Sequence, residues 1–335
     1  MPKIRRIAAA LGRSTGEGWP MQIVILDGYT LNPGDLSWDC LREFGTLSVY
    51  DRTPPELAAQ RLIGADIAFT NKTVIGEREL ERARNLKMIG VLATGYDVVD
   101  TAAAAKRGIV VCNVPSYSTY AVAQHTFALL LEICSQVAHH DREVHRGRWT
   151  HCADYCFWDM PLIELSGKTF GVLGCGRIGN AAAGIAQALG MRAIGYSRGA
   201  HPDFCGERVS LDELFRQSDV LSLHCPATPE TNGVVNAETL AMMKDGAILL
   251  NTARGSLIVE QDVAQALESG KLYACAVDVV DQEPIPRSNP LLNAKNCILT
   301  PHIAWAPFET RKRLLQVTTE NLRAFLNGTP INRVN

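Results

Sequence analysis

Short runs of apolar and β-branched residues alternate with segments of helical character from residue 21 onward. Between them, segments such as PPELAAQRLIG (54–64) and DTAAAAKRG (100–108) predict helices. Strands that alternate with helices form parallel sheets covered on both faces, so the first half of the chain is predicted to be a complete flavodoxin-like domain. Its five predicted strands are QIVILD (22–27), TLSVYD (46–51), ADIAFTN (65–71), KMIGVLAT (87–94) and IVVCNV (109–114).

A much longer helical pattern follows and separates the first alternation from a second one. It predicts a single helix from about Tyr120 to Val144, apolar over most of two faces, which must bury against another domain or a second subunit. The segment 309–330 predicts one amphipathic helix that returns to the first domain. The second alternation predicts six strands, TFGVLG (169–174), RAIGYS (192–197), DVLSLHC (219–225), GAILLNTA (246–253), ACAVDVV (274–280) and NCILTPH (296–302).

These patterns predict an α/β protein of two doubly wound parallel-sheet domains. A flavodoxin-like substrate (catalytic) domain is expected over residues 21–118 and 305–335, with a Rossmann dinucleotide-binding domain inserted over residues 119–304. Residues 1–20 are expected to be an N-terminal extension ahead of a natural start at Met21, because their apolar stretch is too short for a secretory signal.

Composition narrows the choice of partners and compartment. With 335 residues, a net charge of −2 and a pI near 6.5, the chain gives no electrostatic reason to expect nucleic acid or a membrane surface as a partner. Its ten scattered cysteines suit reduced thiols in the cytoplasm. The histidines and cysteines between His139 and Cys156 match no standard zinc spacing, so no metal site is predicted.

A glycine pattern, G-x-G-x-x-G, lies between the first strand and first helix of the second alternation. In the interpretation as a dinucleotide fingerprint, Gly174 permits the tight turn, Gly176 lets the backbone approach a pyrophosphate, and Gly179 lets the helix lie close to the strand. An ordinary glycine-rich turn is the alternative. The acidic residue expected about 20 positions later, which would bind the ribose, is absent, and Ser197 and Arg198 stand there instead.

Three polar residues lie at or near the ends of predicted strands in the same half: Arg254 in NTARGS, Glu283 in DVVDQEP and His302 in TPHIAW. Taken singly, they could be a surface arginine, a solvated glutamate and a capping histidine. Together they supply a carboxylate clamp, a carboxylate that orients an imidazole, and a proton carrier near neutral pH. Open α/β sheets bind ligands at the carboxyl ends of their strands, so we expect these residues at a site.

The chain resembles the D-2-hydroxyacid dehydrogenases from about Met21 to its end, and among them the glycerate dehydrogenases, also called hydroxypyruvate or glyoxylate reductases. The stretches that carry the resemblance are NVPSYSTYAVAQHTFALLLE, WDMPLIELSGKTFGVLGCGRIG, HCPATPETNG, NTARGSLI, AVDVVDQEP and TPHIAWAP.

The resemblance implies roles for residues at matching positions. Arg254 would bind the substrate carboxylate and carbonyl oxygen, His302 would protonate that oxygen, and Glu283 would hold His302. Backbone N–H groups at Thr94 and Gly95 would receive the carboxylate, and Trp305 would narrow the pocket. Cofactor contacts are implied at Gly174, Gly176, Arg177, Ile178, Gly179, Ser197, Arg198, His224, Pro226, Thr231, Thr252, Ala253, Asp278 and His302.

For Asp278, which would contact the nicotinamide amide, a turn-stabilising role is equally plausible from the sequence. The cofactor is NAD(H) or NADP(H), and Arg198 predicts that NADPH is at least tolerated, because an arginine can pair with the 2′-phosphate. Trp305, Tyr96 and Tyr117 favour a small substrate, hydroxypyruvate or glyoxylate, over bulky 2-oxo acids. The exposed face of the long helix, together with the resemblance, implies a homodimer.

Other readings of the same fold stay open. Phosphoglycerate dehydrogenases usually carry a further regulatory domain, and formate dehydrogenases pair the catalytic histidine with glutamine where this chain has Glu283. A nucleotide-sensing corepressor would bind the cofactor without turnover, and a dehydrogenase for another 2-oxo acid would differ only in substrate. Because Arg254, Glu283 and His302 are all present, the enzyme is the favoured interpretation.

Overall fold

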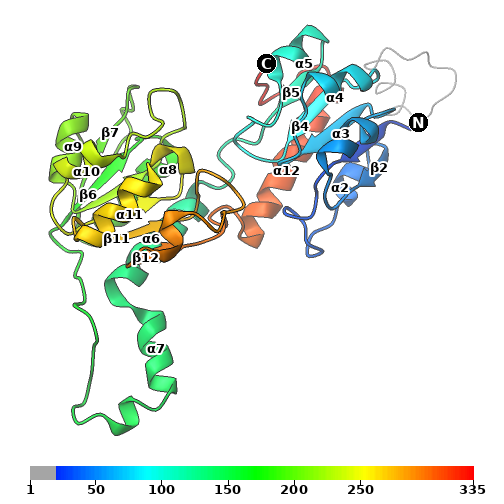
Figure 1. Cartoon of the computed structure of the whole chain (residues 1–335). Coiled ribbons are helices and arrows are strands. Elements are labelled where there is room, and N and C mark those ends of the chain that lie inside the picture. The colour runs from blue at the N-terminus through cyan, green and yellow to red at the C-terminus, as the bar shows by residue number, and fades with distance from the viewer. Residues whose placement is uncertain (1–19) are drawn as a thin grey trace. The chain divides into compact units, whose positions relative to one another are not determined.

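The computed structural model describes residues 20–335, which form two compact units (Figure 1). Of the described residues, unit 1 contains 20–117 together with Ala306–Asn335, and unit 2 contains Ser118–Trp305. The predicted extension falls on residues 1–19, outside the described part, and only Pro20 of it is included.

Unit 1 is built on a five-stranded parallel sheet in the order β2-β1-β3-β4-β5. This is the flavodoxin-like order, and it confirms the predicted fold and all five predicted strands. The strands are β1 (Gln22–Ile25), β2 (Thr46–Val49), β3 (Ile67–Thr70), β4 (Met88–Val91) and β5 (Val110–Cys112). The helices are α2 (Asp39–Arg42), α3 (Pro55–Arg61), α4 (Glu77–Arg82), α5 (Thr101–Lys106) and α12 (Phe308–Leu326).

The last helix, α12, belongs to unit 1 although it follows unit 2 in the chain. Its Arg311 is 8% exposed and donates to both carboxylate oxygens of Asp35, at 2.7 and 2.6 Å. The Arg311 hydrogen bond holds the pKa of the Asp35 carboxyl below its ordinary value. Asn321 donates to the Asn113 carbonyl at 2.8 Å, next to β5. These contacts fix the C-terminal helix against the first sheet, as the amphipathic pattern predicts.

Unit 2 contains a seven-stranded parallel sheet in the order β12-β11-β10-β9-β6-β7-β8. If β6 is numbered as the first strand, this is the strand order of doubly wound dinucleotide-binding domains, with β12 as one further strand at the edge. The six predicted strands form, but β8, a pair of charged residues beside β7, was missed because it has no apolar run. The strands are β6 (Thr169–Leu173), β7 (Arg192–Tyr196), β8 (Glu207–Arg208), β9 (Val220–Leu223), β10 (Ala247–Asn251), β11 (Leu272–Val277) and β12 (Cys297–Leu299).

Helices cover both faces of this sheet. On one face α6 (Thr119–Ser135) and α8 (Arg177–Ala188) contribute to a single core cluster, where Phe127 of α6 stacks on Phe170 of β6 with ring centroids 5.3 Å apart. On the other face α9 (Leu211–Gln217), α10 (Ala237–Met242) and α11 (Glu260–Ser269) bury their apolar residues. Because both faces of the central strands are buried, their sequences are nearly continuous apolar runs.

The predicted single helix from Tyr120 to Val144 is wrong: the structure has two helices, α6 and α7 (Val137–His145), with a bend of 56° between them. Gln136 at the junction adopts a left-handed conformation with φ 51°, which ends the first helix. The α6 helix buries eight side chains, whereas α7 buries none within the chain. Figure 1 shows α7 and the segment after it projecting away from the rest of unit 2.

Within residues 20–335, no single helix is both long and apolar enough to cross a membrane, and α6 with α7 meets that test only as a bent pair. All ten cysteines lie in this range and are free. No cluster of three or more histidine, cysteine, aspartate or glutamate side chains in the same range has a geometry suited to a metal ion.

Candidate active site

The glycine turn after β6 has the conformation that its spacing predicts. Gly174 has φ +105°, and a Cβ there would lie 2.6 Å from the Cys225 amide nitrogen. A Cβ on Gly179 would lie 2.1 Å from the Gly174 carbonyl oxygen, so the first turn of α8 rests directly on the loop. At Gly176 a Cβ would meet nothing within 4 Å. The backbone at the α8 N-terminus therefore borders open space, where an anionic group can approach N–H groups.

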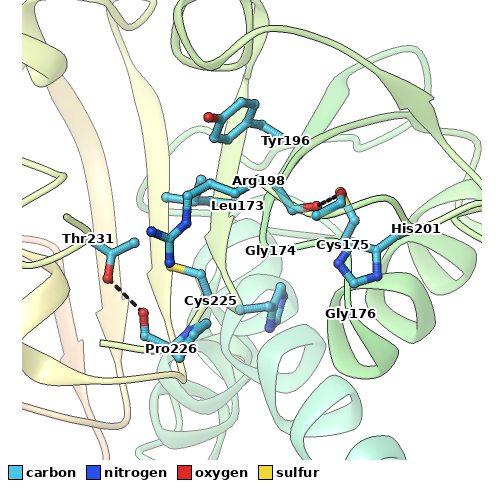
Figure 2. Close-up of a pocket in the computed structure, with 13 residues that line it drawn as sticks. Leu173, Gly174, Cys175, Gly176, Tyr196, Arg198, His201, Cys225, Pro226 and Thr231 are labelled. Atoms are coloured by element: carbon cyan, nitrogen blue, oxygen red, sulfur yellow. Dashed lines mark hydrogen bonds between the residues drawn. The ribbon is translucent and has the colours of Figure 1, made fainter. Parts of the chain in front are cut away.

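A pocket of about 340 Å³ occupies this space. It lies at the carboxyl ends of β6, β7 and β9, and β6 and β9 are the two strands between which the chain order of the sheet reverses. Ligands of open α/β sheets bind at such a point. Figure 2 shows the residues around it, which are Leu173, Gly174, Cys175, Gly176, Tyr196, Ser197, Arg198, Gly199, His201, His224, Cys225, Pro226 and Thr231.

The structure places seven predicted cofactor contacts in this lining, and others in adjoining elements. Those in the lining are Gly174, Gly176, Ser197, Arg198, His224, Pro226 and Thr231. Arg177, Ile178 and Gly179 form the first turn of α8. Thr252 and Ala253 follow β10, where the Thr252 hydroxyl lies 2.9 Å from that of Thr126 in a buried contact.

At the end of β7, where an acidic residue would bind the ribose, the chain has Ser197 and Arg198. The Ser197 hydroxyl donates to the Gly199 carbonyl at 3.2 Å. In Figure 2 the Arg198 side chain extends from this strand toward Cys225 and Thr231. Its guanidinium donates to the Glu230 carboxylate at 3.1 Å. An acidic side chain is thus present beside this part of the pocket, but it comes from another loop.

His224 follows β9, and its backbone lies against the glycine turn at Gly174. Its Nε2 lies 2.8 Å from the Ser222 hydroxyl. Burial lowers the pKa of the His224 imidazole to about 4. The side chain is therefore neutral at physiological pH, so it presents a polar but uncharged group to the pocket.

His302 and Glu283 form a close pair. His302 follows β12 and Glu283 follows the adjacent strand β11, and the His302 Nδ1 lies 2.7 Å from the Glu283 Oε2. The two side chains are 28% and 34% exposed, so the pair is accessible to a ligand. His302 has φ 54°, an uncommon conformation for a residue other than glycine, which is typical of residues held in place at functional sites.

The loop that carries His302 is fixed by Asp278, which is 1% exposed. Its carboxylate accepts hydrogen bonds from the Ile303 and Ala304 amides at 2.9 and 2.8 Å and from the Thr300 hydroxyl at 2.6 Å. Its backbone carbonyl accepts from the His302 amide at 2.8 Å. The geometry thus gives Asp278 the turn-stabilising role that the sequence left open beside a nicotinamide contact.

His125 of α6 completes this network. Its Nε2 lies 3.0 Å from the Thr300 hydroxyl and 3.5 Å from Asp278. Because the Thr300 hydroxyl donates to Asp278, His125 Nε2 must be the donor toward Thr300. Burial raises the pKa of the Asp278 carboxyl, but the hydrogen bonds from His125, Thr300 and the loop amides outweigh burial and leave that pKa below its ordinary value.

Arg254 lies in the loop after β10, next to the segment that leads to Glu283. A Cβ at Gly255 would be 1.9 Å from the Val280 carbonyl carbon, so the two loops are in backbone contact. The Asn251 side chain holds the loop by donating to the Arg254 carbonyl at 2.8 Å. The Arg254 side chain is exposed and donates to the Ala253 carbonyl at 2.8 Å.

The predicted substrate-binding residues fall in both units. Trp305 closes unit 2, and its indole N–H donates to the His302 carbonyl at 2.9 Å. Thr94 and Gly95 belong to unit 1, in the loop after β4. The Thr94 hydroxyl donates to the Val114 carbonyl at 2.9 Å. This contact fixes the Thr94 side chain.

Sequence reasoning missed three polar residues near the site: His125, Thr300 and Glu230. His125 stands in an apolar helical stripe, AVAQHTFALLL, where it reads as a core position. Thr300 reads as the end of a strand. Glu230 lies 32 residues beyond Arg198, with no periodicity to connect them. Because Gln124 and Thr126 flank His125, no feature of this run singles out the histidine.

The sheet order, the glycine turn and the pocket at the switch point define unit 2 as a dinucleotide-binding domain. Residues 127–304 match the family model of the D-isomer-specific 2-hydroxyacid dehydrogenase NAD-binding domain. The chain belongs to this family, as its sequence stretches predict. It is therefore an NAD(P)-linked oxidoreductase of hydroxyacid and oxoacid pairs.

Three relatives illustrate the family. A hydroxypyruvate reductase of Blautia hydrogenotrophica is 54% identical over 94% of this chain and 100% of its own length. A glycerate dehydrogenase of Methylorubrum extorquens is 37% identical over 93% of this chain and 98% of its own. The structure of an NADPH-dependent glyoxylate/hydroxypyruvate reductase from Sinorhizobium meliloti, with NADP and malonate, has a TM-score of 0.81 at 26% identity, covering 94% and 97% of the two chains.

Proposed function

We propose that this enzyme reduces hydroxypyruvate or glyoxylate to the corresponding 2-hydroxy acid, with Arg254, Glu283 and His302 as its catalytic residues. The observation that carries the proposal is the 2.7 Å contact between His302 and Glu283, on a loop fixed by Asp278. The 54% identity to a hydroxypyruvate reductase supports the choice of substrate.

In this proposal His302 is the proton donor. With Nδ1 facing the Glu283 carboxylate, that nitrogen carries a hydrogen, and Nε2 is the second ring nitrogen, which can hold the transferable proton. Reduction adds a hydride to the carbonyl carbon and a proton to the carbonyl oxygen. The reduced nicotinamide supplies the hydride when bound, and His302 supplies the proton. Glu283 orients the imidazole through this contact.

Arg254 would bind the substrate carboxylate. Its guanidinium is exposed at the carboxyl end of the sheet, and a planar fork of N–H donors matches a carboxylate. We further propose that backbone N–H groups of Thr94 and Gly95, in the loop after β4, can receive a carboxylate, as a small anion nest can. Trp305 would limit the size of the substrate.

The cofactor would be held by the pocket at the switch point. The open space at Gly176 suits a pyrophosphate beside the α8 N-terminus. Ser197 and Arg198 would face the adenosine ribose, and His224, Pro226 and Thr231 would line the opposite wall. Thr252, Ala253 and Asp278 would contact the nicotinamide end of the cofactor. Both NADH and NADPH are proposed as cofactors.

We also propose a homodimer in the cytoplasm. The α7 segment and the stretch after it expose large apolar side chains, among them Val137, Tyr155 and Trp158, which are 62%, 90% and 62% exposed. Apolar surface of this kind is typical of a protein interface. A second copy of the chain is the occupant that the family resemblance implies. Ten free cysteines suit a reducing compartment.

The test of the proposed function is a substrate panel with the purified enzyme. Hydroxypyruvate, glyoxylate, pyruvate and a bulky aromatic 2-oxo acid are each supplied with NADH and with NADPH, and oxidation of the cofactor is followed by absorbance. We expect turnover of the first two acids at the highest kcat/KM. A protein that binds the cofactor but reduces none of the acids would contradict the proposal. A strong preference for the aromatic acid would contradict the substrate assignment alone.

A further inference from the structure

An ion pair stands at the edge of the cofactor pocket, where the sequence lacks its usual acid. Arg198 follows β7 and lines the pocket, and its guanidinium donates to the Glu230 Oε2 at 3.1 Å. Glu230 belongs to the loop after β9, on the other side of β6 in the sheet. The side chains are 56% and 63% exposed, so water and a ligand can both reach the pair.

The Glu230 carboxylate is held in place by its own loop. The Thr228 hydroxyl donates to the same Oε2 at 2.7 Å. The Thr231 hydroxyl accepts from the Thr228 amide at 2.8 Å and donates to the Pro226 carbonyl at 2.7 Å. The dashed line in Figure 2 between Thr231 and Pro226 marks the second of these hydrogen bonds. The Thr228 hydrogen bond, the residue's own backbone amide and Arg198 keep the pKa of Glu230 below its ordinary value. Glu230 is therefore an anion at neutral pH.

We propose that Glu230 is a specificity-determining residue, which limits the use of 2′-phosphorylated cofactor by occupying Arg198. The inference rests on the proposed placement of the adenosine ribose beside Ser197 and Arg198. In dinucleotide sites of this type an acid at the end of the second strand binds the ribose, and an arginine nearby accommodates the 2′-phosphate. Here the arginine is present, and the acid is supplied from a different loop.

The two cofactors differ at this point only in charge and size. A phosphate monoester carries about −1.5 to −2 charges at pH 7 and must compete with Glu230 for the Arg198 guanidinium. It also meets the negative charge of the carboxylate. The 2′-hydroxyl of NAD is uncharged and meets neither obstacle. Arg198 alone therefore does not make the enzyme selective for NADPH.

The substitution Glu230→Gln removes the negative charge of the side chain with little change in its shape. Glutamine keeps an oxygen that can accept from Thr228 but removes the charge that holds Arg198. Binding of NADPH and NADH is measured by nicotinamide fluorescence without substrate, so the result does not depend on turnover. We expect the ratio of the two dissociation constants to move roughly two- to fivefold toward NADPH, the scale of an exposed charge interaction.

Glu207→Gln is the matched control. Glu207 is an exposed glutamate in the same unit, paired with Arg192 at 2.6 Å, and neither residue lines the pocket. This variant should leave the ratio unchanged. If Glu230→Gln has no larger effect than Glu207→Gln, the inference is wrong.

The same substitution in a protein that already carries Arg198→Gln tests the role of Arg198. Because Glu230 is proposed to act mainly by occupying this arginine, Glu230→Gln should shift the ratio clearly less when Arg198 is already Gln, where only the direct repulsion of the phosphate remains. A shift of the same size in that background would overturn the inference. If neither cofactor binds the parent protein, the proposed placement of the cofactor fails, and the inference fails with it. That outcome is distinct from normal binding with an unchanged ratio.

Discussion

Two glycines in the same helix are predicted to respond oppositely to the same substitution. Gly179 and Gly184 both lie in α8, five positions apart. A Cβ on Gly184 would meet nothing within 4 Å, whereas a Cβ on Gly179 would lie 2.1 Å from the Gly174 carbonyl oxygen and 2.7 Å from the Val172 Cγ1. The chemical change to alanine is identical, so the difference between the variants reports only the packing of the helix on the glycine loop.

The magnitudes follow from these contacts. In an exposed helix interior, glycine to alanine stabilises the folded state by about 0.5–1 kcal/mol, which is the expectation for Gly184→Ala. Gly179→Ala has the same intrinsic gain, but its Cβ overlaps a backbone oxygen, and overpacking of this kind costs about 1–3 kcal/mol. We therefore expect Gly179→Ala to be the less stable variant by roughly 1–3 kcal/mol.

The assay is denaturant unfolding of the parent and both variants, combined with NADH binding followed by fluorescence. Gly184→Ala should unfold at the parental denaturant concentration or slightly above it and should bind NADH normally. Gly179→Ala should unfold earlier and bind NADH more weakly, because relief of the overlap displaces the loop that lines the pocket. If the two variants matched in both measurements, the close approach of α8 to the fingerprint would be refuted.

Three further predictions concern the substrate, the cofactor and the assembly. Arg254→Lys should lose both affinity and rate, because a point charge does not reproduce bidentate recognition of a carboxylate; a parental kcat/KM for hydroxypyruvate would rule out the clamp. Ser197→Asp should move the ratio of kcat/KM values toward NADH, since a carboxylate repels the 2′-phosphate; an unchanged ratio would show that the ribose lies elsewhere. Sedimentation at micromolar concentration should give a dimer, and a monomer would contradict the assignment of the exposed α7 segment to a subunit interface.

Most of the fold could be predicted because its central strands are buried on both faces. The run AILL in β10 is apolar throughout, and its short length between glycine and polar residues favours a buried strand over a helix. The failures have local causes. The β8 strand consists of Glu207 and Arg208, which only pairing with β7 makes a strand. The break between α6 and α7 depends on the left-handed conformation of Gln136, which glutamine does not signal.

The site could be predicted where its residues follow strands. His302 and Glu283 follow adjacent strands, so their meeting agrees with the rule that ligands bind at the carboxyl edge of the sheet. Glu230 could not be found in this way, because its approach to Arg198 depends on the path of an irregular loop. His125 could not be found either, because a helix face that packs on the sheet brings it to Thr300.

The central claim is that His302 supplies the proton for reduction of a small 2-oxo acid, and the most direct measurement is the kcat of His302→Ala with hydroxypyruvate. NADH binding to the same variant is measured in parallel, because His302 lies outside the lining of the cofactor pocket. We expect kcat to fall by roughly 10²–10⁴-fold, the usual contribution of a positioned general acid, while cofactor affinity stays near the parental value. A variant with near-parental kcat would contradict the account and remove His302 from the mechanism.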